Sequence, residues 1–241
     1  MDIEQRFHDV VQSFWIARDS QKKKQEQGGK IDAGTRGSVT GGTQMGALEV
    51  LVVDILIECG LNQLDIRTRT ALQLSGYFRS EKKWDLLVVS EGQLITAIEF
   101  KSQVGPSFGN NFNNRVEEAL GSATDIWTAY REGRFGLGPH PFLGYFFLLE
   151  DCDKVQRPVR NAQPYFRVDP IFEDASYSKR YEVLCQRLIL ERLYDAACLT
   201  LATNSLPSKI HHPSDDLSFN RFVAELKACA YRFIQSKGIS V

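Results

Sequence analysis

The sequence predicts a single α/β domain in which helices flank a β-sheet. Two apolar runs, 84–89 and 94–98, are joined by a short polar turn, which is typical of a β-hairpin. A third run, PFLGYFFLL over 141–149, predicts a buried strand. Around these runs apolar residues recur every three or four positions, as they do in amphipathic helices. A chain of 241 residues is long enough to bury a sizeable core, and we expect one domain over 1–241.

Composition and charge are those of an ordinary soluble globular protein, with 43% apolar and 24% charged residues. The sequence has no run of 18 apolar residues and no signal-peptide core at its N-terminus, so we expect a cytoplasmic protein. Five scattered cysteines without a C-x-x-C pair indicate reduced thiols, mostly in the core. Because the formal net charge is −1, nucleic-acid binding would need basic groups gathered on one surface.

The N-terminal part combines a helix with a flexible basic segment. Apolar residues at helical spacing predict an amphipathic helix over 2–19. Residues 20–44 are rich in Gly, Lys and Thr and lack periodicity, which predicts a flexible segment. Six basic and three acidic residues between Arg18 and Arg36 give this stretch a net charge of +3. The segment, which includes Lys30, is interpreted either as an arm that orders on a phosphate backbone or as a solvated linker.

Residues 45–59 are apolar on nearly every side, which predicts a buried helix. At about 100° per residue, Asp54 and Glu58 share one side while Glu49 lies on the other, among apolar residues. A lone carboxylate on an apolar face needs a partner. Glu49 is therefore a candidate catalytic and metal-site residue, and the alternative is an ion pair with a core Arg or Lys.

The predicted hairpin carries three residues that can do chemistry: Asp85, Glu99 and Lys101. Side chains alternate along a strand, so Glu99 and Lys101 point to the same face. With a three-residue connection over 91–93, Asp85 lies opposite Glu99, whereas an even-numbered loop would put the two acids on opposite faces. We therefore expect an odd-numbered loop or a bulge.

Two carboxylates beside an ammonium group suit Mg²⁺ and a water activated to attack a phosphate. The hairpin is thus interpreted as a metal-dependent phosphodiesterase centre, and the alternative is a hairpin whose end acids merely reach solvent. Two other E-x-K triplets occur. Residues 81–83 lie in a charged stretch and are interpreted as a solvated loop after an expected strand at 72–78, while 225–227 lie in a helical pattern. Neither is expected to form a shared site.

The expected catalytic core extends over about 45–150. After the hairpin, the sequence VGPSFGNNFNNR over 104–115 predicts a loop that leads into a helix from about 114 to 131. Small residues in that helix would let it approach the sheet closely.

The remaining part, about 151–241, is expected to be a basic excursion followed by helices. Residues 151–174 contain several prolines and basic residues, which predicts irregular structure. Helical patterns cover 177–202 and 215–236. Ser214 precedes two acids and is expected to be the N-cap of the second helix.

The stretches WDLLVV over 84–89 and AIEFKSQ over 97–103 resemble the PD-(D/E)XK nuclease superfamily. With FKSQVGPSFGNNFNNRVEEALGSATDIW, the chain resembles the XhoI family of type II restriction endonucleases, and SYSKRYEVLCQRLILERLYDAACLTL extends this resemblance to nearly the whole length. One departure is Trp84, which stands where the superfamily motif has proline. The resemblance implies a restriction-endonuclease-like core with a central mixed β-sheet flanked by helices, plus a helical C-terminal part.

The resemblance also implies an activity. The chain would be a homodimeric Mg²⁺-dependent enzyme that cuts both strands of double-stranded DNA at the palindrome CTCGAG, after the first C. The products would carry 5′-phosphate ends and four-base overhangs. A companion DNA methyltransferase would protect the host.

Roles for individual residues follow from the same resemblance. Asp85, Glu99 and the carbonyl of Phe100 would hold Mg²⁺, while Lys101 would position or deprotonate the attacking water. Gln103 lies two residues beyond Lys101 on the same strand face, so it is expected either to orient the lysine or a phosphate, or to hydrogen-bond a loop.

Base edges of DNA are read by amide and guanidinium groups. The Asn-rich segment beside the predicted centre is therefore expected to approach the major groove, with Asn side chains on adenine and Arg115 on guanine or phosphate. The DNA-binding candidates are Asn110, Asn111, Asn113, Asn114, Arg115, Lys30, Arg36, Lys154, Arg157 and Arg160.

Other functions stay open at this point. One is a sequence-specific DNA-binding module without catalysis, and another is a different PD-(D/E)XK nuclease that acts in repair or on junctions. A third is a carboxylate metalloenzyme for a small molecule. The intact acids and lysine argue against the first, and the Asn-rich and basic segments argue against the third.

Overall fold

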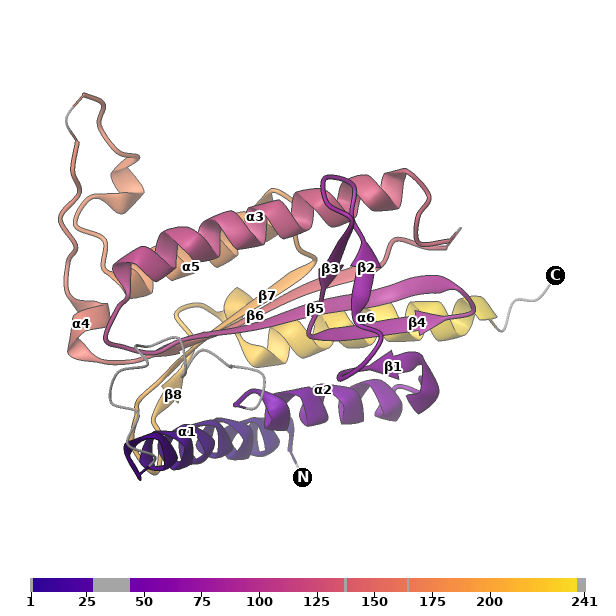
Figure 1. The fold of residues 1–241 in the computed structure, drawn as a ribbon, viewed down its shortest axis with the longest axis horizontal. Coiled ribbons are helices and arrows are strands. Elements are labelled where there is room, and N and C mark those ends of the chain that lie inside the picture. The colour runs from indigo at the N-terminus through magenta and orange to yellow at the C-terminus, as the bar shows by residue number, and fades with distance from the viewer. Residues whose placement is uncertain (1, 28–43, 137, 164, 238–241) are drawn as a thin grey trace.

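The computed structural model describes residues 2–27, 44–136, 138–163 and 165–237. Its centre is a six-stranded sheet in the order β1-β4-β5-β6-β7-β8, and a separate two-stranded sheet, β2-β3, stands over it (Figure 1). The strands are β1 (Ile66–Arg67), β2 (Gln73–Ser75), β3 (Glu81–Lys83), β4 (Leu86–Ser90), β5 (Gln93–Gln103), β6 (Phe142–Glu150), β7 (Ala196–Ala202) and β8 (Ile210–His211).

The central sheet is mixed, as predicted. Strands β5, β6 and β7 run parallel to one another, whereas β1, β4 and β5 form antiparallel pairs and β8 pairs antiparallel with β7. The parallel strands need long crossovers, which the helices between them supply.

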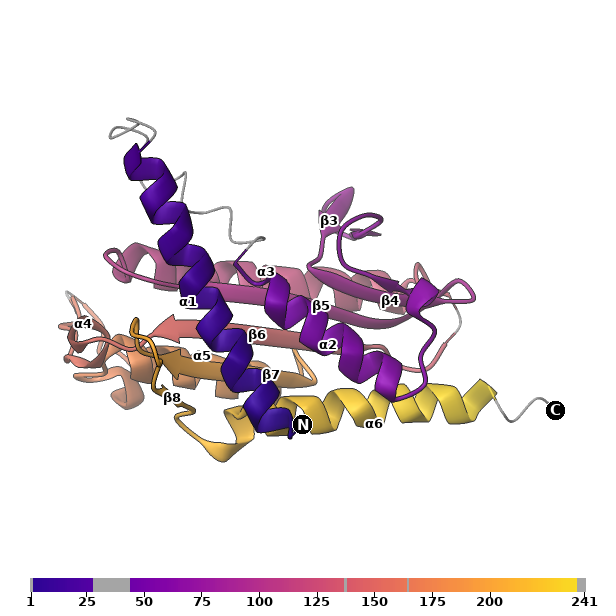
Figure 2. The ribbon, with the colours of Figure 1, turned by 90° about the horizontal axis from the view of Figure 1, so that it is seen from below.

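Helices cover both faces of this sheet (Figures 1 and 2). They are α1 (Ile3–Gln27), α2 (Gly46–Glu58), α3 (Gly109–Arg131), α4 (Asp153–Gln156), α5 (Tyr177–Leu190) and α6 (Phe219–Lys237), with short 3-10 turns at Gln63–Asp65, Pro170–Phe172 and Asp215–Leu217. One apolar core joins α1, α2 and α6 to one face of the sheet, and a second joins α3 and α5 to the other. No helix among the described residues is long and apolar enough to cross a membrane.

Strand alternation divides the long strand β5 between the two cores. Ile98 and Phe100 lie in the core under α2 and α6, whereas Ala97 lies in the core under α3 and α5. Glu99 and Lys101 have the same parity as Ala97, so they lie on the α3 side of the sheet.

The first helix is longer than predicted. The segment from residue 20 to residue 27 is the end of α1, so the expectation of flexibility is wrong there. Lys, Gln and Glu are good helix formers, and the first glycine comes only at Gly28. Lys30 and Arg36, predicted to contact phosphates, lie outside the described residues.

The predicted helix over 177–202 is wrong in its second half. Helix α5 ends at Leu190, Arg192 adopts a positive φ of 54°, and residues 196–202 form the fully buried strand β7. Periodicity does not separate a short apolar strand from a buried helix. The positive φ stops the helix and lets the chain turn back into the sheet.

The last helix begins later than predicted. Ser214 makes no capping hydrogen bond, and residues 215–217 form a 3-10 turn. Ser218 is the N-cap instead, because its hydroxyl accepts a hydrogen bond of 3.2 Å from the amide of Arg221.

The arm formed by β2 and β3 is held against α3 by one buried carboxylate, Asp125. Its Oδ1 accepts hydrogen bonds from the amides of Tyr77 and Phe78, at 2.8 and 2.7 Å, and its Oδ2 lies 2.9 Å from Nε of Arg79. Gly76 is required beside this clasp, because a Cβ there would lie 2.6 Å from Oδ2 of Asp125. The arm is thereby fixed over the α3 side of the sheet.

Candidate active site

The pair β4 and β5 brings the two predicted acids together. Its first three residue pairs have the predicted register, in which Asp85 lies opposite Glu99. A bulge between Val88 and Val89 then shifts the pairing by one residue. This bulge confirms the expectation of an odd-numbered loop or a bulge: the connection itself is a two-residue turn, with φ of 53° and 74° at residues 91–92. The bulge restores the parity that this even-numbered turn would otherwise lose.

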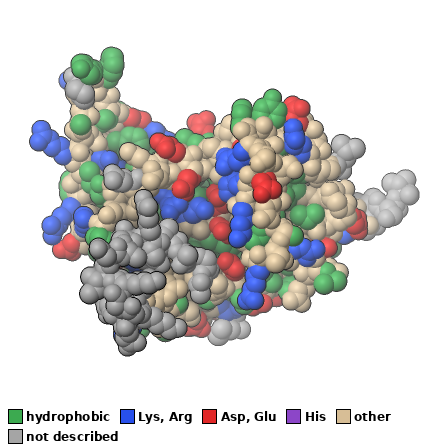
Figure 3. Space-filling view, viewed as in Figure 1, with side chains coloured by type: hydrophobic (Ala, Val, Ile, Leu, Met, Phe, Trp, Pro, Cys, Tyr) green, Lys and Arg blue, Asp and Glu red, His purple; other side chains and the backbone are tan. Residues whose placement is uncertain are grey.

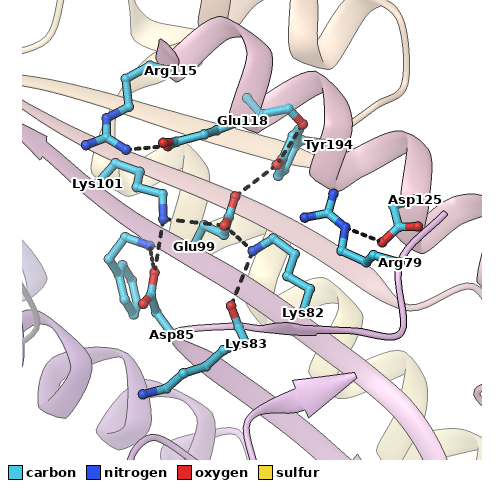
Figure 4. Close-up of polar contacts among 12 residues, drawn as sticks. Arg79, Lys82, Lys83, Asp85, Glu99, Lys101, Arg115, Glu118, Asp125 and Tyr194 are labelled. Atoms are coloured by element: carbon cyan, nitrogen blue, oxygen red, sulfur yellow. Dashed lines mark hydrogen bonds and ion pairs between the residues drawn. The ribbon is translucent and has the colours of Figure 1, made fainter. Parts of the chain in front are cut away.

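Glu99 is the most enclosed of the acids, with 2% of its surface exposed. Its Oε1 contacts Nζ of Lys82 and lies 3.4 Å from Nζ of Lys101 (Figure 4). Its Oε2 accepts a hydrogen bond of 3.3 Å from the hydroxyl of Tyr194. Burial raises the pKa of Glu99, but Lys101 and Lys82 together outweigh burial and hold this pKa below its ordinary value. The buried carboxylate is therefore ionised.

Tyr194 is itself buried and acts as a donor to the acid. Its hydroxyl lies 3.3 Å from both Oε2 of Glu99 and the carbonyl oxygen of Ala119 on α3. Burial, with the neighbouring Glu99 carboxylate, holds the pKa of Tyr194 well above its ordinary value, so the hydroxyl keeps its proton.

Asp85 closes the opposite side of the site and is more open to solvent. Its Oδ2 accepts a hydrogen bond of 2.8 Å from the amide of Phe100 and lies 3.9 Å from Nζ of Lys101. Its side chain is 38% exposed. Asp85, Glu99 and Lys101 thus share one small volume that is buried at Glu99 and accessible at Asp85.

Glu49 approaches this volume from α2. It is half-buried, and burial raises its pKa, as does the negative charge of Asp85, while Arg69 and Lys83 partly offset both. Within the part of the chain that the structure describes, Glu49 forms no salt bridge, so the alternative of a buried ion pair is not what is found.

Gln103 lies on the predicted strand face but is turned to the loop. Its side-chain nitrogen donates to the carbonyl oxygens of Val104 and Ser107, at 3.1 and 2.9 Å. The loop alternative is the arrangement found, and the expected contact with Lys101 or a phosphate has no support in these hydrogen bonds. Gln103 shapes the chain between β5 and α3.

Lys82, like Tyr194, is a site residue that sequence reasoning missed. Residues 81–83 were expected to be a solvated loop without a part in any shared site, and this expectation is wrong, because they form β3 and Lys82 contacts Glu99. Its ammonium also lies 4.1 Å from the ring centre of Trp84. Alternation along β3 toward buried Trp84 was the available signal, since it places Lys82 on the inner side.

The Asn-rich segment opens α3 instead of preceding it. The predicted loop up to about residue 114 is wrong, because α3 begins at Gly109, and Phe108 and Phe112 pack four residues apart in the core. Asn110 lies in this first turn, and Asn113 and Asn114 have exposed side chains.

Two other DNA-binding candidates in this helix have partners within the chain. The side-chain nitrogen Nδ2 of Asn111 donates a hydrogen bond of 2.6 Å to the carbonyl oxygen of Ser107. Arg115 pairs with Glu118, while its Nε is buried without a hydrogen-bond partner among the described residues. Of the candidates in this helix whose side chains the structure describes, Asn113 and Asn114 are the exposed ones.

The excursion before α5 projects away from the sheet (Figure 1) and contains only the short α4 and one 3-10 turn in its described residues. Nζ of Lys154 donates a hydrogen bond of 2.7 Å to the carbonyl oxygen of Pro106, and Nη2 of Arg157 lies 3.2 Å from Oδ2 of Asp153. Arg160 is exposed. On the face seen in Figure 3, basic side chains lie between acidic ones over the middle of the molecule, around the β2–β3 arm. The arm and the exposed arginines therefore offer cations without a uniformly basic surface.

Comparison with known proteins identifies the family. Residues 24–211 match the family described as restriction endonuclease XhoI. The type II restriction enzyme BstVI of Geobacillus stearothermophilus is 46% identical over 202 residues, which cover 81% of this chain and 90% of that enzyme. The type II restriction enzyme XhoI of Xanthomonas vasicola is 46% identical over 75% of this chain and 73% of its own length. The type II restriction enzyme AbrI of Azospirillum brasilense is 47% identical over 69% of this chain and 75% of its own length.

No solved structure matches the chain significantly. The family match covers most of the sequence, including β3, β4, β5, α3 and Tyr194, which build the site described above. The sequence-based resemblance is thus confirmed, and the chain belongs to the XhoI family of type II restriction endonucleases.

Proposed function

We propose that this chain is a Mg²⁺-dependent endonuclease that cuts both strands of double-stranded DNA at CTCGAG, after the first C, to leave 5′-phosphate ends. The observation that carries the proposal is the convergence of Asp85, Glu99 and Lys101 on one sheet face, in a chain 46% identical to the XhoI enzyme. We place the enzyme in the cytoplasm, beside a companion methyltransferase that needs no contact with it.

The residues present fit Mg²⁺, which needs few protein ligands, better than they fit a metal ion whose ligands all come from the protein. Among the described residues, no three His, Cys, Asp or Glu side chains form a metal-binding group. Mg²⁺ commonly takes one or two carboxylates and completes its shell with water and substrate phosphates. Asp85, Glu99 and the Phe100 carbonyl would hold it, with Glu49 nearby as a partner for metal-bound water.

The bound ion would polarise the scissile phosphate and lower the pKa of a water molecule. Lys101, whose ammonium lies between the two carboxylates, orients the attacking water and stabilises charge that builds on the phosphate. Tyr194 holds Glu99 from the buried side, so this carboxylate keeps its position. Attack in line with the 3′-oxygen leaves the phosphate on the 5′ end.

A palindromic site has twofold symmetry, and a homodimer with the same symmetry presents one active site to each strand. Asn113 and Asn114, exposed at the start of α3, are our candidates for reading adenine edges in the major groove. Arg157 and Arg160 on the excursion are candidates for phosphate contacts.

The proposal is tested with two plasmids that differ by a single CTCGAG site. With MgCl2, the protein should linearise only the plasmid that carries the site, and sequencing of the ends should place the cut after the first C. Discrete cutting at another sequence would refute the proposed site, smearing would indicate a non-specific nuclease, and an intact plasmid would indicate a binding protein without catalysis.

A further inference from the structure

The acid at the centre of the site has more cationic partners than the proposed metal chemistry requires. Glu99 faces two ammonium groups, Lys82 and Lys101, both on Oε1, and its Oε2 faces the Tyr194 hydroxyl (Figure 4). Lys101 belongs to the same strand as Glu99, whereas Lys82 is brought to it by a different strand, β3. An ion that bound Oε1 of Glu99 would have to share it with Lys82.

The position of Lys82 is built into the fold. Asp125 on α3 binds three consecutive residues of the arm that carries β3, Tyr77, Phe78 and Arg79. The Asp125 side chain is 3% exposed. Trp84, 1% exposed, supports the ammonium of Lys82 from below at 4.1 Å. The Lys82 side chain is 13% exposed. Its ammonium is therefore held between an indole ring and the Glu99 carboxylate.

The charges at the site explain what this arrangement does. Asp85 and Glu99 are partnered by the ammonium groups of Lys82 and Lys101. Glu49, the third acid nearby, lies near the positive charges of Arg69 and Lys83. The acids that would attract a divalent ion are thus already offset by cations when DNA is absent. A DNA phosphate adds negative charge and gives the Lys82 ammonium a second partner. Interactions in such an enclosed site are screened less than in water.

We propose that Lys82 is a positioning residue that occupies the Glu99 carboxylate in the DNA-free enzyme, competes there with the divalent metal, and is drawn away by a DNA phosphate. This rests on the proposed metal-dependent function and adds to it a reason for ordered assembly, in which metal binds tightly only when DNA is present. Binding of DNA and binding of metal are then coupled, and the coupling must be equal in both directions.

The test measures Ca²⁺ binding by calorimetry, because Ca²⁺ takes the same oxygen ligands as Mg²⁺. Titrations are made without DNA and with a duplex that contains CTCGAG, and a gel verifies that the duplex stays intact. The variants are K82Q, which removes the ammonium, and K82R, which keeps a cation. K83Q is the matched control, because it removes the same charge from the adjacent residue, whose side chain points away from Glu99 (Figure 4) and acts on Glu49 without contacting Glu99.

K82Q is expected to bind Ca²⁺ about tenfold more tightly than wild type without DNA, a change of about 1.4 kcal/mol. The gain in Ca²⁺ affinity that DNA produces should shrink by the same factor. K82R should resemble wild type, and K83Q should change Ca²⁺ affinity much less than K82Q, because Lys83 acts on Glu49 but does not contact Glu99. The proposal is overturned if K82Q binds Ca²⁺ no more tightly than wild type, or if K83Q changes affinity as much as K82Q.

Failure of the proposed metal site would look different. D85N removes a proposed ligand and leaves Lys82 and Glu99 in place, so it should lower Ca²⁺ affinity with and without DNA. Unchanged Ca²⁺ binding by D85N would refute the metal site itself, whatever K82Q does. Far-UV circular dichroism of each variant verifies that the fold is retained, and a purely structural role of Lys82 would not tighten metal binding.

Discussion

Replacing Glu99 with Gln separates the catalytic role of this acid from its structural role. The change keeps the shape of the side chain but removes the negative charge that Lys82 and Lys101 share. Removing one partner of a buried ion pair costs about 3–5 kcal/mol. Because the two lysine side chains keep 13% and 22% of their surface exposed, water reduces this cost. We expect a loss of about 2–4 kcal/mol in the free energy of unfolding.

Asp85→Asn is the matched comparison. Asp85 is 38% exposed and its ammonium partner lies 3.9 Å away, so loss of this pair should cost less than about 1 kcal/mol. An asparagine oxygen can still accept the hydrogen bond from the amide of Phe100. Both variants should lose cleavage at least about hundredfold, the effect of one key electrostatic group, and both should retain specific DNA binding.

Urea denaturation, cleavage of one cognate duplex and binding to that duplex measure the three quantities on the same preparations. A domain of this size shifts its melting temperature by about 2–4 °C per kcal/mol, so thermal melts should place Glu99→Gln roughly 5–15 °C below wild type. The reasoning is refuted if Glu99→Gln is as stable as Asp85→Asn, or if either variant cuts at more than about one hundredth of the wild-type rate.

Four further predictions follow from single side chains. Glu49→Gln removes a carboxylate whose pKa is raised above its ordinary value of 4.5 in the folded state, so ionisation of this group destabilises the fold as pH rises. Urea titrations should therefore show wild type losing stability relative to the variant above about pH 4.5. Cleavage assays of the variant should show slower turnover and a greater need for Mg²⁺. Lys101→Ala should reduce turnover far more than DNA binding, as measured on one duplex. Asn113→Ala or Asn114→Ala should weaken cognate binding by about 1–3 kcal/mol and leave non-cognate binding nearly unchanged in gel-shift titrations; equal weakening of both would indicate a backbone contact. Ser218→Ala should lower stability by about 1 kcal/mol in urea denaturation with no effect on cleavage, because it removes an N-cap.

Local chemistry explains why the hairpin could be predicted from sequence. Two apolar runs, a polar turn and strict alternation determine which side chains share a face. The requirement that Asp85 meet Glu99 predicted an odd-numbered loop or a bulge, and the structure has the bulge. Local chemistry did not predict the mixed sheet, because strand order depends on contacts between distant segments. That prediction came from the resemblance to a family. Residues 196–202 show the limit, because seven buried residues, six of them apolar, carry no period that distinguishes a central strand from a buried helix.

The place of Lys82 depends on a contact that no local pattern encodes. Alternation along 81–84 indicates which side of β3 faces inward, but it does not say what lies there, because β3 pairs with β2 in a separate sheet and not with a strand of the central sheet. What lies there is fixed by Asp125, which binds the amides of Tyr77 and Phe78 from a helix 47 and 48 residues further along the chain. Alternation along β3 thus determines which face Lys82 lies on, and the contacts with Asp125 bring that face to Glu99. A charged triplet that looks solvated in isolation therefore delivers its lysine to the most buried acid of the site.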